Sequence, residues 1–454
     1  MNNSVSIRFV LFATGVTAIG GFLFGYDTAV INGANSYLTA DMHLNSAQQG
    51  MAGGSAILGC IPGAMFAGFL SDRFGRKKML FLCALLYAVS GILSAIPNTF
   101  AEFLSARFIS GLGIGASSMI CPVYIAEISP EKWRGRLGTL FQLGIVTGIF
   151  LTLFINKVIQ GLGDEMWNTA YGWRWMLGME VVPAMAFIAL LFAVPESPRW
   201  LAQRGREIEA RDILEKAGGA EHAQFEMASI REAMNFEQGR FSELFNGPFR
   251  KPLIIAVVLM ACSQFCGINA IMYYSTKIFA AAGGGENAAF TSSVWVGLIN
   301  LVFTFVAIGF VDKAGRRPLL LIGTAVQAVA LALVGWMFHA QIAGAGLLAC
   351  VILFIAAFAM AMGPVGWLFC SEIFPNKLRG RAMSIAALTV WISCYVVAQT
   401  FPMLNDSPAI GPAKTFWTYA VVSLFSFFFI LALVPETKRR TLEQIEKMWS
   451  AKPK

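Results

Sequence analysis

The chain has 454 residues, of which 57% are apolar and only 13% are charged, whereas soluble proteins carry roughly 25% charged residues. This composition excludes a water-soluble globular protein and a long disordered chain. The net charge of +8 does not indicate nucleic acid as a partner, because the basic residues fall in short clusters between long apolar segments and form no single patch.

Twelve mostly apolar segments are each long enough to cross a bilayer, which takes roughly 20 residues. They are predicted at residues 9–31, 50–70, 79–97, 102–124, 137–159, 174–194, 253–275, 288–311, 318–338, 342–369, 382–404 and 415–434. The first segment lacks the basic leader and the cleavage site of a signal peptide, so we interpret it as a retained helix. The sequence therefore predicts an all-α membrane protein.

Most of the 34 Lys and Arg residues lie in alternate connecting segments, which predicts that both termini are cytoplasmic. The longest polar segment follows the sixth span and contains a short amphipathic helix, Arg206 to Gly219, that ends in two glycines. The predicted division is a six-helix half at 1–194, cytoplasmic linker helices at 195–252, a second six-helix half at 253–434 and a cytoplasmic C-terminal helix at 435–454.

An internal repeat supports two pseudo-symmetric halves. SDRFGRK returns as VDKAGRR at an offset of 240, AEISPEKWRGR returns as SEIFPNKLRGR at an offset of 245, and Pro-Glu-Ser at 195 returns as Pro-Glu-Thr at 435. Because six is even, the two copies share one orientation across the membrane, as in transporters whose halves rock about a site at mid-membrane.

Acids stand beside bases in these repeated loops, which indicates conformational latches on the cytoplasmic face, with Arg134, Arg136, Arg379 and Arg381 as partners for Glu127, Glu196, Glu372 or Glu436. The alternative is that the bases only set the topology. The predicted latch residues are Asp72, Arg76, Glu127, Arg134, Glu196, Asp312, Arg316, Glu372, Arg379 and Glu436.

Three ionisable residues lie deep within spans, where a charge is costly and indicates a function: Asp27, Arg107 and Glu180. In the repeat, Asp27 aligns with Asn269, so only the first half carries the acid. One interpretation is a structural ion pair of Asp27 with Arg107. The other is a proton switch, in which protonation of Asp27 releases the pair, with Glu180 as a weaker candidate for the same role.

Polar uncharged and aromatic side chains within the spans suit a neutral polyhydroxylated ligand, because amides both donate and accept and aromatic faces cover C–H surfaces. The alternative is that the amides only join helices. The candidates are Phe24, Gln142, Ser263, Gln264, Asn269, Tyr273, Asn300, Phe358, Gly363, Trp367 and Trp391. Gly267 and Gly363-Pro364 are predicted to loosen spans seven and ten.

No arrangement of a nucleophile with a base, and no metal-ligand spacing of Cys and His, is visible. The eight cysteines lie in or beside apolar segments and are interpreted as packing residues. The sequence predicts no enzyme, no metal site and no cofactor.

The motifs GFLSDRFGRKK, PVYIAEISPEKWRGRLG, PESPRW, QFCGINAIMYYS and PETK resemble those of the sugar porter branch of the major facilitator superfamily, closest to bacterial proton-coupled pentose and hexose symporters. The resemblance covers the whole chain. It implies that Asp27 accepts the proton beside Arg107 and that the loop charges stabilise the outward-facing state. It also implies that sugar hydroxyls meet Gln142, Gln264, Asn269, Asn300 and Trp367, with Phe24, Tyr273, Gly363 and Trp391 nearby.

Two residues depart from the family's pattern. Ser263 stands where such porters commonly carry Gln, and Val390 stands where related symporters often carry an amide. Losing two amides enlarges and dries part of the pocket, so a linear polyol or a ketose stays an alternative to an aldose.

These observations predict a monomeric proton-coupled symporter of a monosaccharide or sugar alcohol, surrounded by lipid in the cell inner membrane and working by alternating access. The alternatives are an uncoupled uniporter of the same fold and a transporter-like nutrient receptor.

Overall fold

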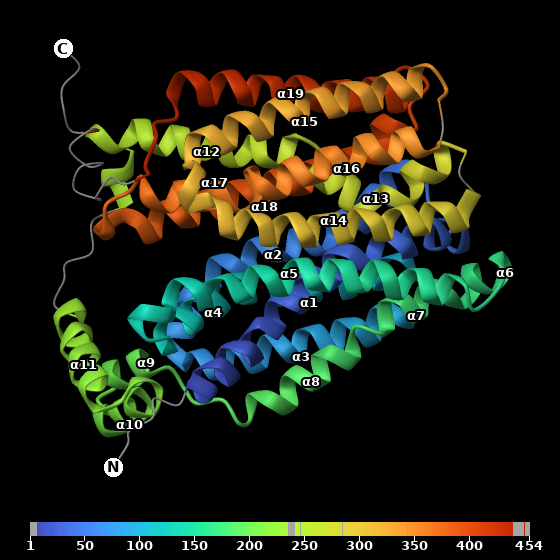
Figure 1. The fold of residues 1–454 in the computed structure, drawn as a ribbon. Coiled ribbons are helices and arrows are strands. Elements are labelled where there is room, and N and C mark those ends of the chain that lie inside the picture. The colour runs from blue at the N-terminus through green and yellow to red at the C-terminus, as the bar shows by residue number, and fades with distance from the viewer. Residues whose placement is uncertain are drawn as a thin grey trace. The chain divides into compact units, whose positions relative to one another are not determined.

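The computed structural model describes residues 7–234, 241–245, 247–283, 285–342, 344–438 and Trp449, and over these ranges it contains helices and no strands (Figure 1). Twelve helical segments are long and apolar enough to cross a membrane. The predicted all-α fold with twelve spans is confirmed. The helix predicted at 435–454 falls almost entirely outside the described residues.

The first six spans end at Leu191, close to residue 194, where the first half was predicted to end. They are α1 (Ile7–Asp41), α2 (Ser46–Phe74), α3 (Arg76–Ala95), α4 (Phe100–Ile128), α5 (Glu131–Gln160) and an interrupted span of α6 (Glu165–Trp167), the π-helix η1 (Asn168–Gly172), α7 (Trp173–Gly178) and α8 (Val181–Leu191).

The linker and the remaining spans follow. They are α9 (Pro198–Gln203), α10 (Glu207–Gly218), α11 (Ala220–Met234), the 3₁₀ turns η2 (Phe241–Leu244) and η3 (Gly247–Phe249), α12 (Arg250–Phe265), α13 (Ile268–Ala281), α14 (Gly285–Ala314), α15 (Arg316–His339), α16 (Ala345–Met360), α17 (Met362–Glu372), α18 (Asn376–Asn405) and α19 (Gly411–Leu433).

Contacts group the chain into two compact units. The first comprises residues 1–28, 58–149 and 174–237, and the second comprises 29–57, 150–173 and 238–454. The units differ from the predicted halves in that 29–57 and 150–173 group with the second half. Hydrogen bonds within the second unit give the reason: Asn32 donates to the Met272 carbonyl at 2.7 Å and accepts from the Thr276 N–H at 3.1 Å.

In the first unit, glycines bring α1 and α5 into backbone contact. A Cβ at Gly21 would lie 2.5 Å from the Phe141 carbonyl oxygen, and one at Gly144 would lie 2.5 Å from the Ala18 carbonyl oxygen. Gly25 is still closer to α5. Such small-residue seams are how membrane helices approach closely, and this seam holds the segment of α1 that carries Asp27.

A second seam joins α2 to α4. A Cβ at Gly63 would lie 2.5 Å from the Leu112 carbonyl oxygen, and Gly59 and Gly115 face equally close backbone atoms. Helix α4 is therefore held against α2 along the turns that follow Arg107.

Span seven breaks at Gly267, as predicted. The residue has a left-handed conformation, with φ 86°, between α12 and α13, which is the region that glycine adopts without strain. A side chain would also not fit, because a Cβ would lie 2.5 Å from the ring of Tyr419 in α19. The break thus has both a conformational and a steric cause.

Prolines account for the breaks in spans ten and six that follow Met360 and Gly178. Pro364 cannot donate to Met360 and its ring would clash with that carbonyl, so span ten ends one helix at Met360 and starts the next at Met362. The break falls two residues before the predicted Gly363. In span six, Pro183 acts on Met179 in the same way, and Glu180 lies in the turn between α7 and α8.

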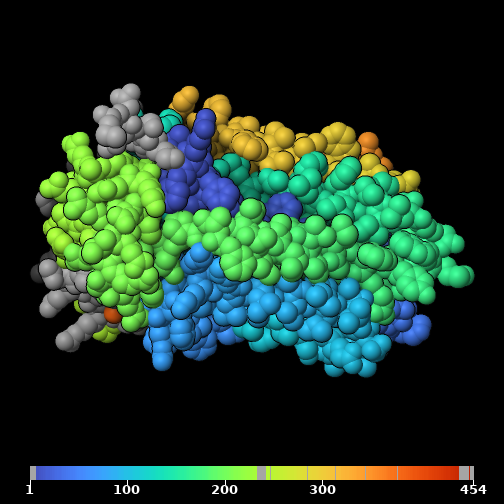
Figure 2. Space-filling model, turned by 90° about the horizontal axis from the view of Figure 1, so that it is seen from below, coloured from blue at the N-terminus to red at the C-terminus, as the bar shows by residue number. Residues whose placement is uncertain are grey.

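The linker helices belong to the first unit but have a small hydrophobic core of their own, and Figure 2 shows them as one compact group in light green continuing from the end of α8. Its core consists of Leu201, Ala202, Ala210, Leu214, Ala223, Met227 and Ile230. Helix α10 has the predicted bounds almost exactly and stops where Gly219 takes φ 88°, as a glycine C-cap does.

We predict that Gly25→Ala destabilises the protein, whereas Gly15→Ala in the same helix does not. Alanine is a better helix former than glycine by roughly 1 kcal/mol, and a Cβ at Gly15 meets nothing within 4 Å. At Gly25 it would meet the Ile145 carbonyl, so α1 and α5 must separate. Thermal unfolding of the purified variants in detergent measures the difference. Equal melting temperatures would contradict the close seam.

Candidate functional site

Asp27 of α1 and Arg107 of α4, both in the first unit, are almost fully buried. Asp27 is 0% exposed and Arg107 is 2% exposed. One guanidinium nitrogen, Nη1, forms an ion pair with Asp27 Oδ1, and Nη2 donates to the Asp27 backbone carbonyl at 3.1 Å. Among the described residues, Asp27 Oδ2 has no hydrogen-bond partner. The carboxylate therefore has one satisfied oxygen and one that is open to a proton.

Glu180 is the third ionisable residue predicted within the spans. It is 1% exposed and close enough to Asp27 and Arg107 for electrostatic interaction. Its Oε1 has no partner within the described part of the chain. Beside it, the Tyr26 hydroxyl donates to the Met176 carbonyl at 3.1 Å. The first unit thus gathers two acids around one guanidinium. Gain or loss of one proton by either acid would change the net charge of this group.

The ligand candidates of the first unit are Phe24 and Gln142, on the two helices that the glycine seam joins. Both side chains are half-buried. Each could present a surface to a small molecule without first being uncovered.

In the second unit the break at Gly267 brings three of the predicted ligand residues together. Asn269 donates to Gln264 at 2.5 Å, Gln264 donates to Ser263 at 3.0 Å, and Ser263 donates to the Met260 carbonyl at 2.7 Å. The Asn269–Gln264 hydrogen bond joins the first turn of α13 to the last turn of α12 across the break.

The other ligand candidates lie on α13, α14, α16, α17 and α18, with Phe358 on α16. Tyr273 is 5% exposed and its hydroxyl lies 3.9 Å from the sulfur of Cys394, which is three residues from Trp391 and so a neighbour on α18. Gly363 and Trp367 stand one turn apart on α17. Asn300 is 7% exposed on α14, whereas Trp367 is 37% exposed.

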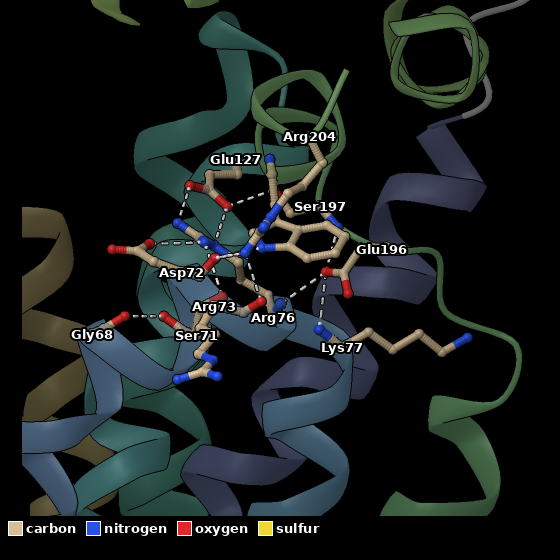
Figure 3. Close-up of polar contacts among 11 residues, drawn as sticks. Gly68, Ser71, Asp72, Arg73, Arg76, Lys77, Glu127, Glu196, Ser197 and Arg204 are labelled. Atoms are coloured by element: carbon tan, nitrogen blue, oxygen red, sulfur yellow. Dashed lines mark hydrogen bonds and ion pairs between the residues drawn. The ribbon is translucent and has the colours of Figure 1, made fainter. Parts of the chain in front are cut away.

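The repeated loop of the first unit forms a compact charge cluster, drawn in Figure 3. Arg76 makes two hydrogen bonds with Glu127, at 3.1 and 3.2 Å, and one with Asp72 at 3.0 Å. Glu196 accepts the backbone N–H groups of Arg76 and Lys77 at 2.9 and 3.0 Å. A carboxylate distant in sequence thereby caps the N-terminus of α3, where the free N–H groups and the helix dipole attract an anion.

The second unit repeats this arrangement. Arg316 pairs with Glu372 at 2.8 Å, and Glu436 accepts the N–H groups of Arg316 and Arg317, both at 3.1 Å, at the start of α15. The side chain of Asp312, also predicted in this cluster, lies outside the described residues. The duplicated motif therefore encodes a duplicated structure, in which an arginine pairs with a glutamate and a second glutamate caps a helix N-terminus.

The arginines of the two RGR sequences behave differently from the prediction. Arg134 pairs with Glu226 of α11 at 2.7 Å, and Arg379 donates to the Phe374 carbonyl at 3.4 Å. The repeated RGR spacing could not identify the partner of Arg134, because Glu226 lies in the linker, which has no counterpart in the repeat.

Three further residues of the first cluster escaped the sequence analysis. The Ser197 hydroxyl donates to Glu127 at 2.6 Å, and Trp200 and Arg204 donate to the Asp72 carbonyl at 2.9 and 3.1 Å. The two donors stabilise the C-terminal end of α2, where carbonyl groups lack partners. The motif PESPRW was the available signal, since it contains Ser197 and Trp200.

The second unit also has a polar cluster that we did not predict. Lys277 at the end of α13 donates to Gln49 of α2 at 2.5 Å and pairs with Asp406 at 2.7 Å. Burial of Asp406 opposes its ionisation, but hydrogen bonds from Lys277, Asn405 and Ser46 outweigh this and lower the pKa of Asp406.

Comparison with known proteins decides the family. The family described as "Sugar (and other) transporter" matches residues 13–449. The chain belongs to this family.

Its relatives match it along nearly their whole length. The arabinose-proton symporter of Bacillus subtilis is 41% identical, with 99% of this chain and 97% of the relative covered. The D-xylose-proton symporter of Escherichia coli is 37% identical over 100% of this chain and 98% of its own. The inward-open structure of the xylose transporter from E. coli has a TM-score of 0.87 at 36% identity and covers 97% of this chain and 100% of that one. The sugar transporter is therefore a multi-pass membrane protein and not an enzyme.

We predict that Glu196→Gln and Glu436→Gln each lower the free energy of unfolding by about 1–2 kcal/mol, because hydrogen bonds to a charged acceptor are stronger than those to an amide. The two losses should add, since the caps share no partner. Glu215→Gln, whose side chain accepts from exposed Arg211, should change little. Denaturant titration in mixed micelles measures all three. A cap variant as stable as Glu215→Gln would contradict the capping role.

Proposed function

We propose that this sugar transporter is a proton-coupled symporter of a neutral monosaccharide, with Asp27 as the proton acceptor. The observation that carries the proposal is the fully buried Asp27–Arg107 pair with its open Oδ2. Relatives named as arabinose-proton, D-xylose-proton and galactose-proton symporters support it.

The coupling follows from the energetics of buried charge. Desolvation of two charges and their mutual attraction are nearly balanced, so a modest change decides whether the pair holds. A proton on Oδ2 neutralises Asp27 and removes most of its attraction for Arg107. The proton thereby changes the relative stability of the arrangements that α1 and α4 can adopt, which is the requirement for a conformational switch. Glu180, buried and close enough to both charges for electrostatic interaction, is a second candidate for the proton.

The membrane potential supplies the driving force. A charge that crosses 100 mV gains about 2.3 kcal/mol, and about 1.4 kcal/mol corresponds to a tenfold concentration ratio. One proton per cycle therefore supports more than tenfold accumulation. An uncoupled uniporter of the same fold has no need of a buried acid at this position.

The substrate-binding groups that we propose lie within each unit. In the first they are Gln142 and Phe24. In the second they are Gln264 and Asn269, with Tyr273, Asn300, Gly363, Trp367 and Trp391. Amides bind hydroxyls and the aromatic rings cover C–H faces. Because Ser263 and Val390 replace amides expected from the resemblance, the panel of substrates to be tested includes a ketose and a polyol beside pentoses and hexoses.

We further propose that the protein is a monomer in the cell inner membrane with both termini in the cytoplasm, and that the Arg76 and Arg316 clusters act as latches on the cytoplasmic face. The distribution of Lys and Arg among the connecting segments supports this orientation. Each latch joins three elements through one arginine and one carboxylate cap, so that opening it would expose a helix N-terminus and several charges together.

We predict that Asp27→Asn abolishes uptake driven by a pH gradient while sugar exchange at equal pH persists. The amide retains the size of the carboxyl but carries no titrating proton. Proteoliposomes loaded with the test sugars measure both activities.

The matched control is Asp212→Asn, an exposed acid on α10, which should leave both activities unchanged. Full pH-driven uptake by Asp27→Asn would overturn the proton role. Net sugar uptake by the wild-type protein that never changes the pH of the lumen would favour the uniporter.

A further inference from the structure

The three hydrogen bonds around the break in span seven run in one direction. They lead from Asn269 Nδ2 to Gln264 Oε1, from Gln264 Nε2 to Ser263 Oγ, and from Ser263 Oγ to the Met260 carbonyl. Each distance lies within 2.5–3.0 Å. The series begins in α13 and ends on the backbone of α12, so it crosses the Gly267 break through side chains.

Each hydrogen bond fixes the orientation of the next side chain in the series. The Ser263 hydroxyl has a single hydrogen, which the Met260 carbonyl takes, so towards Gln264 its oxygen can only accept. Gln264 must therefore turn its amino end to Ser263 and its carbonyl end to Asn269. The reversed amide would face the Ser263 oxygen with its own carbonyl oxygen, acceptor against acceptor.

Exposure separates the three residues. Ser263 is 3% exposed, whereas Gln264 and Asn269 are half-buried. The serine is therefore covered in this conformation, and the two amides are partly accessible. After the series is formed, Gln264 still offers its second N–H, and Asn269 offers its carbonyl oxygen and its second N–H.

We infer that Ser263 is a positioning residue: it fixes the orientation of the Gln264 amide and thereby sets which sugar epimers the Gln264–Asn269 pair prefers. The inference rests on the proposed function and deepens it. A sugar hydroxyl can donate or accept, but epimers direct their neighbouring hydroxyls differently, so a fixed pattern of donors and acceptors distinguishes them. A site built to match such a pattern discriminates because a mismatched ligand leaves polar groups unpaired.

A serine hydroxyl bonded to the carbonyl three residues earlier is common in membrane helices and by itself shows no function. Ser118 in α4 makes that bond to Gly115 at 2.7 Å, the same length as in Ser263. The acceptance of the Gln264 amide is what distinguishes Ser263, and Ser118→Ala is therefore the matched control.

The test compares Ser263→Ala, Ser263→Thr, Gln264→Ala and the double variant Ser263→Ala/Gln264→Ala in proteoliposomes at equal pH on both sides. Exchange of D-xylose, L-arabinose, D-galactose and D-glucose is measured without a proton gradient, so a failure of proton coupling does not affect the result. We expect Ser263→Ala to raise the KM for the preferred sugar about three- to tenfold, as for one lost neutral hydrogen bond, with the maximal rate unchanged and the preference among epimers reduced. Ser263→Thr keeps the hydroxyl and should restore both, and Ser118→Ala should change neither.

The double variant separates positioning from direct contact. If Ser263 acts through Gln264, Ser263→Ala has no further effect on KM or epimer preference once Gln264 is alanine. The same fold-change in both backgrounds would overturn the inference, and so would an unchanged epimer preference in Ser263→Ala.

A sugar-independent measurement uses the wild type, Ser263→Ala, Gln264→Ala and the double variant. Their thermal unfolding in detergent should show coupled, non-additive shifts for Ser263 and Gln264 in the absence of any ligand. Additive shifts would overturn the series of hydrogen bonds itself, whatever the protein transports, whereas coupled shifts without exchange of any sugar would count against the proposed function alone.

Discussion

Two charges sealed away from water impose the strictest requirement on this protein, because Asp27 and Arg107 are tolerated inside the first unit only while they satisfy each other. The pair needs α1 and α4 to be held in place with little freedom. Two glycine seams provide this, one between α1 and α5 and one between α2 and α4, where backbones approach until no Cβ would fit. The electrostatics of the site thus depend on the absence of side chains elsewhere in the same helices.

The internal repeat shows which features the two halves share and where they differ. Both halves cap a helix N-terminus with a distant glutamate, Glu196 or Glu436, and pair an arginine with an acid. They differ where Asp27 aligns with Asn269. The acid holds a charge against a guanidinium, and the amide belongs to a series of neutral hydrogen bonds beside a broken helix. The two copies share one scaffold. At one aligned position the first copy carries the charged Asp27 and the second carries the hydrogen-bonding Asn269.

Much of this could be predicted because lipid limits the possibilities. Apolar segments of about 20 residues must be helices when no water can satisfy the backbone, and an acid with a single basic partner available in the spans must lie near it. Other features had no local signal. The partner of Arg134 is Glu226, far along the chain in the linker, and Pro183 was an overlooked sign of the break that places Glu180. The cluster of Lys277, Gln49 and Asp406 joins three distant segments whose composition is ordinary.

The sequence by itself determined the class of fold, the number of spans, the repeat and the short set of residues that could carry a proton or bind hydroxyls, because hydropathy, charge and spacing are properties of the chain alone. Only the tertiary structure decided how those residues are used. Gly267 was predicted to loosen span seven, but only the structure shows its left-handed conformation and the hydrogen bond by which Asn269 contacts Gln264 across the break. Which donor bonds to which acceptor depends on the positions and orientations of the side chains in space, and the order of residues along the chain does not specify these.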